Sequence, residues 1–159
     1  MSIRLFRIDE RLIHGQVIMG WGRELQFRRY LVVDDELAES PWEQELYALA
    51  LESDADVRFS SVEDARRSLG DWLGDDVPSV LLTRDPEQMA RLAAGRLLEG
   101  REVNVGGLHH RPGRQEIRSY VHLDAEDRDA LRSLSEEGVL VSGRDLPSSS
   151  RVSLEQLLR

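Results

Sequence analysis

The stretch IRLFRIDERLIHGQV, residues 3–17, sets the architecture of the chain. Its first six residues, Ile3–Ile8, have the length and apolar content of a β-strand. Apolar residues then recur three and four positions apart, which predicts a helix with one buried face, at Val17, Ile18, Trp21 and Leu25. A strand that leads through a short polar turn into a helix is typical of the start of an α/β protein.

This alternation of strand and helix continues along the chain. Six more short apolar runs have the length of strands, at Tyr30–Val33, Val57–Phe59, Ser79–Thr83, Glu102–Val105, Ile117–Val121 and Val139–Ser142. Four more stretches show helical spacing of apolar residues: Trp42, Leu46, Leu49 and Ala50; Ala65, Leu69, Trp72 and Leu73; Met89, Leu92, Ala93 and Leu97; Ala130, Leu131 and Leu134. Repeated β-α-β order means parallel strands. We expect an α/β fold with a doubly wound, mostly parallel open sheet of about six or seven strands and helices on both faces.

Helix starts are marked by capping residues. Ser40 precedes a proline and lies three residues before Glu43, a capping box. Asp85 precedes a proline in the same way, and Asp124 is placed to cap the fifth helix, whose C-terminal stop is Gly138. Ser153 opens a last short helix.

The composition excludes several chemistries. The chain has 159 residues, about the length of one domain, and we expect residues 1–159 to form a single domain. It has no cysteine, which rules out disulfides, thiol catalysis and thiolate zinc sites. All 21 basic residues are arginine, so neither a Schiff-base lysine nor a P-loop lysine is present.

Charge and hydropathy narrow the class of partner. The net charge of −9 argues against general nucleic-acid binding, which normally shows a basic footprint. No window approaches the ~18 consecutive apolar residues of a transmembrane helix. The first residues mix charges with apolar residues, unlike a signal peptide. These features predict a cytoplasmic protein with no segment inserted in a membrane.

The loops at the carboxyl ends of the strands hold the candidate site, because ligands of open α/β sheets bind there. His14 lies in the first of these loops, at the start of a helix whose N–H groups favour an anion. Arg11 precedes it by three residues and can donate two hydrogen bonds to a phosphoryl group. A histidine in these surroundings suits a phosphorylated imidazole. The alternative is that His14 only caps the helix.

Other loops offer weaker signals. Gly106 and Gly107 follow a strand, where they form either an anion-binding turn or an ordinary tight turn. His109 and His110 are adjacent, so their side chains point apart and do not chelate as a pair. The run 34–36, Asp-Asp-Glu, suits either magnesium or a helix-capping turn, and we favour the turn. We expect neither a metal nor a cofactor.

The segment RIDERLIHGQV, residues 7–17, resembles the phosphorylation site of the IIB components of the mannose/fructose/sorbose family of the bacterial sugar phosphotransferase system (PTS). The likeness extends through Val32–Glu36, Asn104–Gly107, and the C-terminal segments at 138–139 and 144–147. It implies a doubly wound, mostly parallel sheet with one antiparallel strand near an edge. Other IIB families use a phosphocysteine, which this chain lacks.

The resemblance also implies roles for individual residues. His14 matches the histidine that is phosphorylated on Nδ1, and Arg11 matches the arginine that stabilises the phosphoryl group. A second set matches the supporting residues of the site: Asp9, Gly15, Gln16, Asn104, Gly106 and Gly107. The residues that we expect to face partner proteins are Leu12, Ile13, Arg84, His109, His110 and Arg111.

The implied activity is that of a phosphotransferase. A separate, phosphorylated IIA protein would donate the phosphoryl group to His14, and a sugar bound by membrane IIC/IID components would accept it. The protein would then be cytoplasmic and peripherally associated with the permease. One alternative is a regulatory phosphorelay protein that uses the same His14 without sugar transport. Another is a module that binds an anion at the first loop without chemistry.

Overall fold

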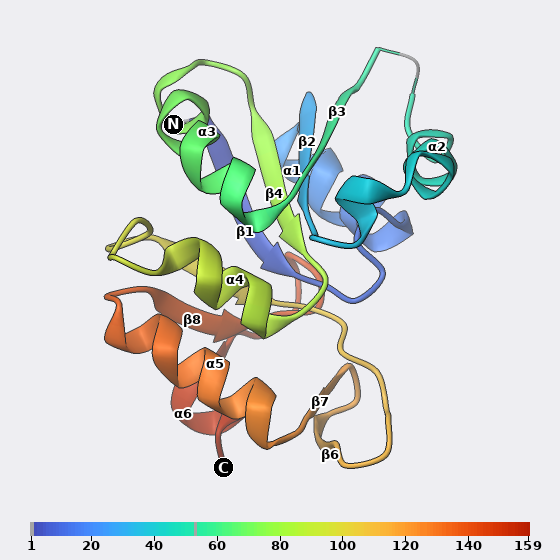
Figure 1. The fold of residues 1–159 in the computed structure, drawn as a ribbon. Helices are drawn as coiled ribbons and strands as arrows, with labels where there is room; N and C mark the ends of the chain where they lie inside the picture. Colours follow the sequence, from blue (N-terminus) through green and yellow to red (C-terminus); the bar gives the residue numbers. More distant parts are fainter. Residues whose placement is uncertain (1, 53) are drawn as a thin grey trace.

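The structure is a computed structural model that describes residues 2–52 and 54–159. Its main sheet has seven strands in the order β3-β2-β4-β1-β5-β8-β9. Their bounds are β1 Ile3–Ile8, β2 Arg29–Val33, β3 Asp56–Ser60, β4 Ser79–Thr83, β5 Glu102–Val105, β8 Leu140–Gly143 and β9 Val152–Ser153. All pairs are parallel except β8 with β9, which is antiparallel at the edge. The predicted sheet, mostly parallel with an antiparallel strand at one edge, is confirmed, and β1 lies at its centre (Figure 1).

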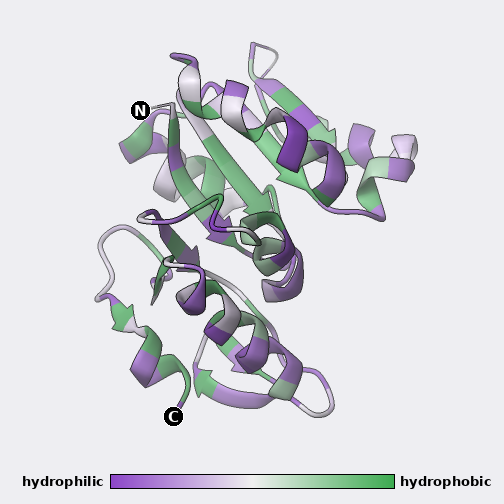
Figure 2. Cartoon of the chain, turned by 60° about the vertical axis from the view of Figure 1, so that its left-hand side comes forward, coloured by the Kyte–Doolittle hydropathy of each residue, from purple (hydrophilic) through white to green (hydrophobic). Residues whose placement is uncertain are grey.

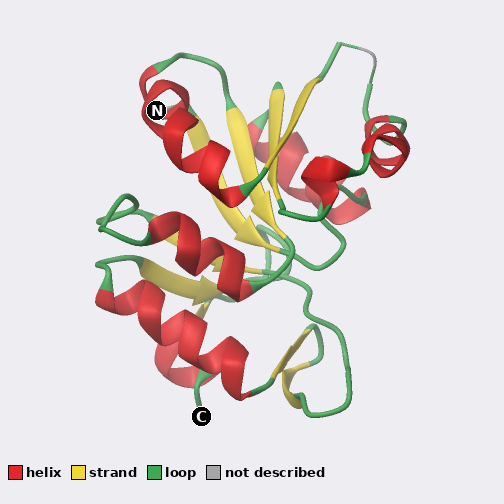
Figure 3. Ribbon diagram, in the orientation of Figure 1, coloured by secondary structure: helices red, strands yellow, loops and turns green. Residues whose placement is uncertain are grey.

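Helices cover both faces of this sheet (Figure 3). The helical segments are the π-helical turn η1 Gln16–Trp21, α1 Gly22–Leu25, the 3₁₀ turn η2 Leu37–Glu39, α2 Pro41–Ala48, α3 Val62–Gly74, α4 Pro86–Ala93, α5 Ala125–Glu136 and α6 Leu154–Leu157. In Figure 1, α3, α4 and α5 lie side by side on one face, and α3 and α5 each pack against α4. The η1–α1 segment and α2 follow β1 and β2 and cover the other face.

Two apolar clusters fill the space between the sheet and these helices. The central strands β2 and β4 are largely green in the hydropathy view of Figure 2, and both of their faces are buried. On β2, Leu31 and Val33 contact the cluster under α3–α5. Tyr30 and Val32, which alternate with them, contact the cluster under η1. This alternation places Arg7 and Asp9 of the first strand and its loop on the η1 side, because Phe6 and Ile8 face the other cluster.

Most helix starts follow the predicted caps. The side chains of Asp85, Asp124 and Ser153 each accept a hydrogen bond from the backbone three residues on. Gly138 ends the fifth helix with a left-handed φ of +84°. The prediction for Ser40 was wrong, because its side chain makes no cap hydrogen bond. The 3₁₀ turn η2 leads directly into α2 and sets the Ser40 backbone outside the usual cap conformation.

The predicted strand Ile117–Val121 is also wrong. Two short antiparallel strands replace it, β6 Gln115–Arg118 and β7 Val121–Leu123. They form a hairpin apart from the main sheet, at the lower right of Figure 1. Ser119 and Tyr120 form the two-residue turn between the strands, which divides the predicted run.

The helical face predicted at Trp42, Leu46 and Leu49 is not buried. All three side chains are more than half exposed, whereas Tyr47 packs against the cluster under η1. Leu97, predicted for the α4 face, follows that helix and is 39% exposed. Trp42 and Leu46 instead line a groove of about 420 Å³ next to Ile13 and Arg84. Helical spacing thus identified an apolar face, but no other element among residues 2–52 and 54–159 covers that face.

Candidate active site

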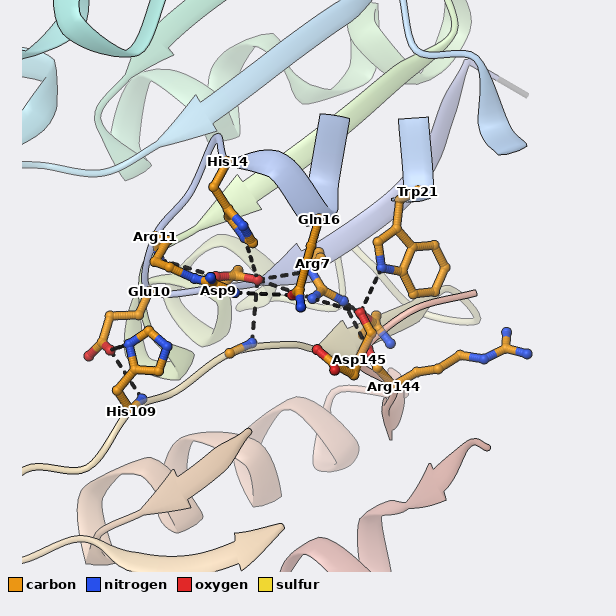
Figure 4. A network of polar contacts seen from close by, with 12 residues as sticks. Arg7, Asp9, Glu10, Arg11, His14, Gln16, Trp21, His109, Arg144 and Asp145 are labelled. Carbon is orange, nitrogen blue, oxygen red and sulfur yellow. Dashed lines mark hydrogen bonds and ion pairs between the residues drawn. The ribbon is translucent and has the colours of Figure 1, made fainter. Parts of the chain in front are cut away.

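The site lies at the carboxyl end of β1, between the loops that follow β4 and β5. The connection after β1 runs to one face of the sheet and the connection after β4 runs to the other, so the site is at a topological switch point. The loops after β1 and β5 are joined directly, because Glu10 N–H donates to Gly107 O at 2.8 Å. The prediction that these two loops share one site is therefore consistent with their positions (Figure 4).

His14 is folded back over the carboxylate of Asp9. Its Nε2 atom lies 2.9 Å from Asp9 Oδ2, in a close polar contact rather than an aligned hydrogen bond. The side chain is 13% exposed, so the ring lies at the surface with one edge inward. Leu12, two residues earlier, has a left-handed φ of +57°, which is strained for leucine and reverses the chain direction here. The turn is what brings the histidine back toward Asp9.

Asp9 is buried and binds four groups. Its Oδ2 accepts from the Nε and Nη2 of Arg7 at 3.2 and 3.1 Å and from Gly107 N–H at 3.3 Å. Its Oδ1 accepts from the Arg11 backbone N–H at 3.1 Å. Burial alone would raise the pKa of Asp9, but the contacts with His14 and Arg7 outweigh it and lower that pKa. Asp9 is therefore a carboxylate in this site, and it shapes the loop as expected.

Arg11 is the exposed cation of the site. Its side chain is 42% exposed, its Nε lies 3.8 Å from Asp9 Oδ1, and its Nη2 donates to Gln16 Oε1 at 3.0 Å. The guanidinium thus lies beside the histidine loop with most of its donors directed to solvent. Gly15, which lies between His14 and Gln16 in the sequence, is exposed and has open space where a Cβ would lie.

Asn104, Gly106 and Gly107 support the site from β5. Gly106 N–H donates to Ile8 O at 2.7 Å, and Gly107 N–H is bound to Asp9. Neither N–H is therefore free for an anion, which favours the tight-turn alternative. A Cβ on Gly106 would lie 2.3 Å from the Arg7 guanidinium, so only glycine fits there.

The partner-facing role predicted for Leu12 and Ile13 is wrong. Both side chains are buried, Leu12 fully, in the cluster under η1. The left-handed turn at Leu12 directs these apolar side chains into the core, where burial is favourable. Contact area beside the histidine therefore comes from other residues.

The remaining predicted partner residues lie around the rim. Arg84 donates to Asp34 Oδ1 at 3.2 Å, and His109 Nδ1 lies 2.8 Å from Glu10 Oε2. His110 is exposed, with its ring edge-on to His122 at 5.8 Å. Arg111 is exposed as well, at a hollow of about 680 Å³ between α4 and α5 whose lining is mostly acidic. Of these rim residues, Arg84 and His109 are therefore each in contact with a carboxylate, Asp34 and Glu10.

The acidic run at 34–36 is part of the scaffold. Asp34 accepts from Leu37 N–H at 2.9 Å and so caps η2, while Asp35 accepts from Val62 N–H at 2.9 Å and from Arg91 Nη1 at 2.7 Å. Within residues 2–52 and 54–159 no group of three or more His, Cys, Asp or Glu is arranged to hold a metal ion.

Two buried arginines were missed by the sequence analysis. Arg7 binds Asp9 and lies 5.4 Å above the Trp21 ring, and Trp21 Nε1 donates to Asp145 O at 3.0 Å. Arg114 binds Glu10 Oε1 at 3.2 Å and Asp127 Oδ2 at 3.1 Å beneath His109. The available signal for Arg7 was a charged residue within a central strand, two positions before an aspartate on the same face.

Comparisons with known proteins agree with this geometry. Residues 3–159 match the family described as the PTS system sorbose subfamily IIB component. The chain belongs to this family. Its sequence is 34% identical over 157 residues to the N-acetylgalactosamine-specific phosphotransferase enzyme IIB component 2 of Escherichia coli K12, covering 99% of each chain. The resemblance seen in residues 7–17 is thereby confirmed.

Further relatives show the same fold and one fused arrangement. The crystal structure of the N-acetylgalactosamine-specific IIB component 1 of Escherichia coli has a TM-score of 0.87 and 31% identity, covering 96% of this chain and 99% of that one. The mannose-specific EIIAB component of Escherichia coli K12 is 29% identical over 160 residues, covering 99% of this chain and 49% of that protein. This IIB family member therefore takes part in the sugar phosphotransferase system. Among its described residues, no helix is long and apolar enough to cross a membrane.

Proposed function

We propose that residues 1–159 form a single IIB domain that carries a phosphoryl group on His14 Nδ1. The observation that supports this most is the orientation of the ring: Nε2 faces the buried Asp9 carboxylate. The other ring nitrogen is then the one directed away from Asp9. A phosphorylated IIA protein is the proposed donor, and a sugar on membrane IIC/IID components is the proposed acceptor.

Asp9 prepares the histidine for attack. A carboxylate next to Nε2 favours the tautomer with the proton on Nε2, which leaves the lone pair on Nδ1. The two atoms already lie at hydrogen-bond distance, 2.9 Å, without the alignment of a hydrogen bond. Such contacts commonly tighten when a partner binds.

The transfer moves the phosphoryl group between two nitrogens. The Nδ1 lone pair forms the new bond to phosphorus while the bond to the donor imidazole breaks, and the donor ring keeps that electron pair. The two rings must lie in line across phosphorus. In the second step a sugar hydroxyl attacks, the P–Nδ1 bond breaks, and the hydroxyl proton leaves to a base of the acceptor site or to water.

Arg11 stabilises the charge on the phosphoryl oxygens. Its guanidinium is exposed, with Nη2 bound to Gln16 Oε1 and Nε 3.8 Å from Asp9 Oδ1. A planar guanidinium can donate two parallel hydrogen bonds to phosphate. The electrostatic gain is largest in the transition state, when the partner has displaced water from the site.

The partners follow from the family. The name EIIAB joins an A with a B component in the mannose-specific relative, which supports a IIA protein as the donor. The acceptor would be a sugar held by membrane proteins, so we propose a cytoplasmic protein that associates peripherally with them. The exposed rim around His14 is the surface that each partner would contact in turn.

The test is phosphate transfer from a ³²P-labelled, phosphorylated IIA protein of this subfamily, followed by peptide mapping at neutral pH. We expect one acid-labile phosphate on His14, lost in His14→Ala. His109→Ala and His110→Ala are matched controls, because both remove a histidine from the same rim, and they should retain the label. Absence of label on the wild-type chain, or label on His14→Ala, would overturn the proposal.

A second stage separates transport from regulation. Membranes with IIC/IID components and sugar are added to the labelled protein. Loss of the label to a sugar phosphate supports the transport role. Retention of the label on His14 with these acceptors present supports the regulatory alternative.

A further inference from the structure

Arg7 is a fully buried arginine whose hydrogen-bonding capacity is completely used. Its Nε and Nη2 donate to Asp9 Oδ2, and its Nη1 donates to Asn104 Oδ1. The remaining donors bind the backbone carbonyls of Arg144 at 2.9 Å and Asp145 at 3.2 Å. These five contacts account for all five N–H groups of a guanidinium.

These contacts come from distant parts of the chain. Arg7 is on β1, and Asn104 is its register partner on β5. Arg144 and Asp145 follow β8, and the Trp21 ring of η1 lies 5.4 Å from the guanidinium. Arg7 therefore occupies the place where the histidine segment, the β5 loop and the C-terminal loop meet (Figure 4).

Burying a charge is costly unless it is paired and hydrogen-bonded. An apolar side chain at this position would fill the volume without that cost. It would also leave the Asp9 carboxylate with no buried cation. A buried ion pair next to a reactive group is thus explained better by what it does for Asp9 than by stability.

We propose that Arg7 is a positioning residue for phosphoryl transfer, which holds the Asp9 carboxylate facing His14 Nε2. The inference rests on the proposed function of His14. Arg7 does not reach the phosphoryl group, because its side chain is fully buried. It acts by fixing Oδ2, the oxygen shared by Arg7 and His14.

Lysine and glutamine are not equivalent at this position. A lysine ammonium keeps the charge but is a point donor that cannot make the fork to Asp9 together with the bond to Asn104. Glutamine removes the charge. In both variants the carboxylate loses the guanidinium fork but keeps its bonds from the Gly107 and Arg11 backbone N–H groups, so Oδ2 is held less firmly toward His14. The Nε2–H preference of His14 is then weakened. Outer-shell partners of this kind typically contribute about 10- to 100-fold in activity.

Arg29 provides a matched control. It is also a buried arginine in a parallel strand, β2, and it binds Asp75 and Ser79. It lies at the start of its strand, at the end of the sheet opposite to His14. Arg29→Gln therefore removes a buried charge without touching the site.

The experiment has a spectroscopic and a kinetic part. The ¹H–¹⁵N spectrum of the unphosphorylated protein distinguishes Nε2–H from Nδ1–H imidazoles, and the His14 signal is assigned by its loss in His14→Ala. We expect one dominant Nε2–H tautomer in the wild type and a mixture in Arg7→Gln. The phosphorylation rate should fall about 10- to 100-fold in Arg7→Gln and less in Arg7→Lys.

The outcomes separate this inference from the proposed function. A wild-type chain that accepts no phosphate refutes the function of His14 itself. A folded Arg7→Gln with the wild-type tautomer and a rate within about twofold would refute the positioning role alone. If Arg7→Gln does not fold, Arg7→Lys decides by the same two measurements. Equal changes in Arg29→Gln would show a general effect of losing a buried arginine.

Discussion

The two ends of the sheet use buried arginines in different ways. At the amino end, Arg29 makes two bonds to the Asp75 carboxylate, at 2.6 and 3.1 Å, and donates to Ser79 Oγ at 2.8 Å. At the carboxyl end, Arg7 binds Asp9, but the same carboxylate also contacts His14, whose side chain is 13% exposed. The Arg29–Asp75 pair contacts no group of the candidate site, whereas the Arg7–Asp9 pair holds His14, which reaches the surface.

This difference separates stability from chemistry within one fold. The contacts of Arg29 join β2, β4 and the segment after α3, so they act on folding. The contacts of Arg7 join the loops of the candidate site. Ligand sites of open α/β sheets lie at the carboxyl ends of the strands, so substitutions at the two ends are expected to have separable effects.

The largest effect is expected for Arg11→Ala at the carboxyl end. Loss of the exposed guanidinium should slow phosphorylation of His14 about 10- to 100-fold, because a charged donor to the phosphoryl oxygens is removed. The free energy of unfolding should change by no more than about 0.5 kcal/mol, since the site is exposed. Phosphorylation kinetics and thermal melts measure both quantities.

Arg67→Ala is the matched control for this variant. Arg67 is an exposed arginine on α3 that is paired with Asp64. It should leave both the rate and the melting temperature unchanged. A large drop in melting temperature for Arg11→Ala would show that Arg11 is structural.

Asp75→Asn tests the Arg29–Asp75 ion pair at the amino end of the sheet through the pH dependence of stability. The hydrogen bonds from Arg29 and then from the Val77 backbone lower the pKa of Asp75. Because the pKa of Asp75 is lower in the folded protein than its unfolded value of about 3.9, the ionised carboxylate stabilises the folded state above that pH. This stabilisation is lost as the pH falls through the folded-state pKa. Asp75→Asn should therefore melt below the wild type at pH 7, with a difference that shrinks below about pH 4.

The phosphorylation rate at pH 7 is the second measurement for this variant. It should match the wild type, because Asp75 lies at the opposite end of the sheet from His14. A constant difference in melting temperature at every pH would show that the ion pair is not its source. A slowed transfer would show that the two ends are coupled.

The sequence was sufficient for the parts of the fold that depend on local pattern. Strand length, helical spacing and capping aspartates predicted the sheet, and β-α-β order placed His14 and Asn104 in neighbouring loops. Helical spacing failed at α2, because it shows that Trp42 and Leu46 share a face but not whether anything covers it. The hairpin at Gln115–Leu123 failed because the predicted run contained a two-residue turn.

The ion pairs and hydrogen bonds of the site could not be predicted from local sequence patterns. The bonds of Arg7 to Asn104 and to the Arg144 carbonyl join residues 97 and 137 positions apart. The burial of Leu12 and Ile13 depends on one left-handed residue, which no propensity favours for leucine. His14 and Arg11 were identifiable because both lie in one short loop.

The smallest effect is expected at the rim, for Arg111→Glu. Arg84 and His109 are each paired with a carboxylate, which leaves Arg111 as an exposed cation beside an acidic hollow. If the phosphorylated donor docks over this flank of His14, charge reversal should slow transfer about three- to tenfold at low salt, through slower encounter. Screening shortens from about 10 Å at 0.1 M salt to about 3 Å at 1 M, so the difference should largely vanish at high salt.

Arg132→Glu on α5 makes the same change in net charge. Arg132 is half-exposed and paired with Asp129 within α5. A general effect of a more negative chain would slow both variants equally, because long-range repulsion does not depend on which arginine is reversed. A slower rate for Arg111→Glu alone would place the donor on the β5 side of His14. Equal rates for Arg111→Glu and the wild type at both salt concentrations would place the donor elsewhere. The remaining docking surface beside His14 would then be the apolar groove next to Trp42.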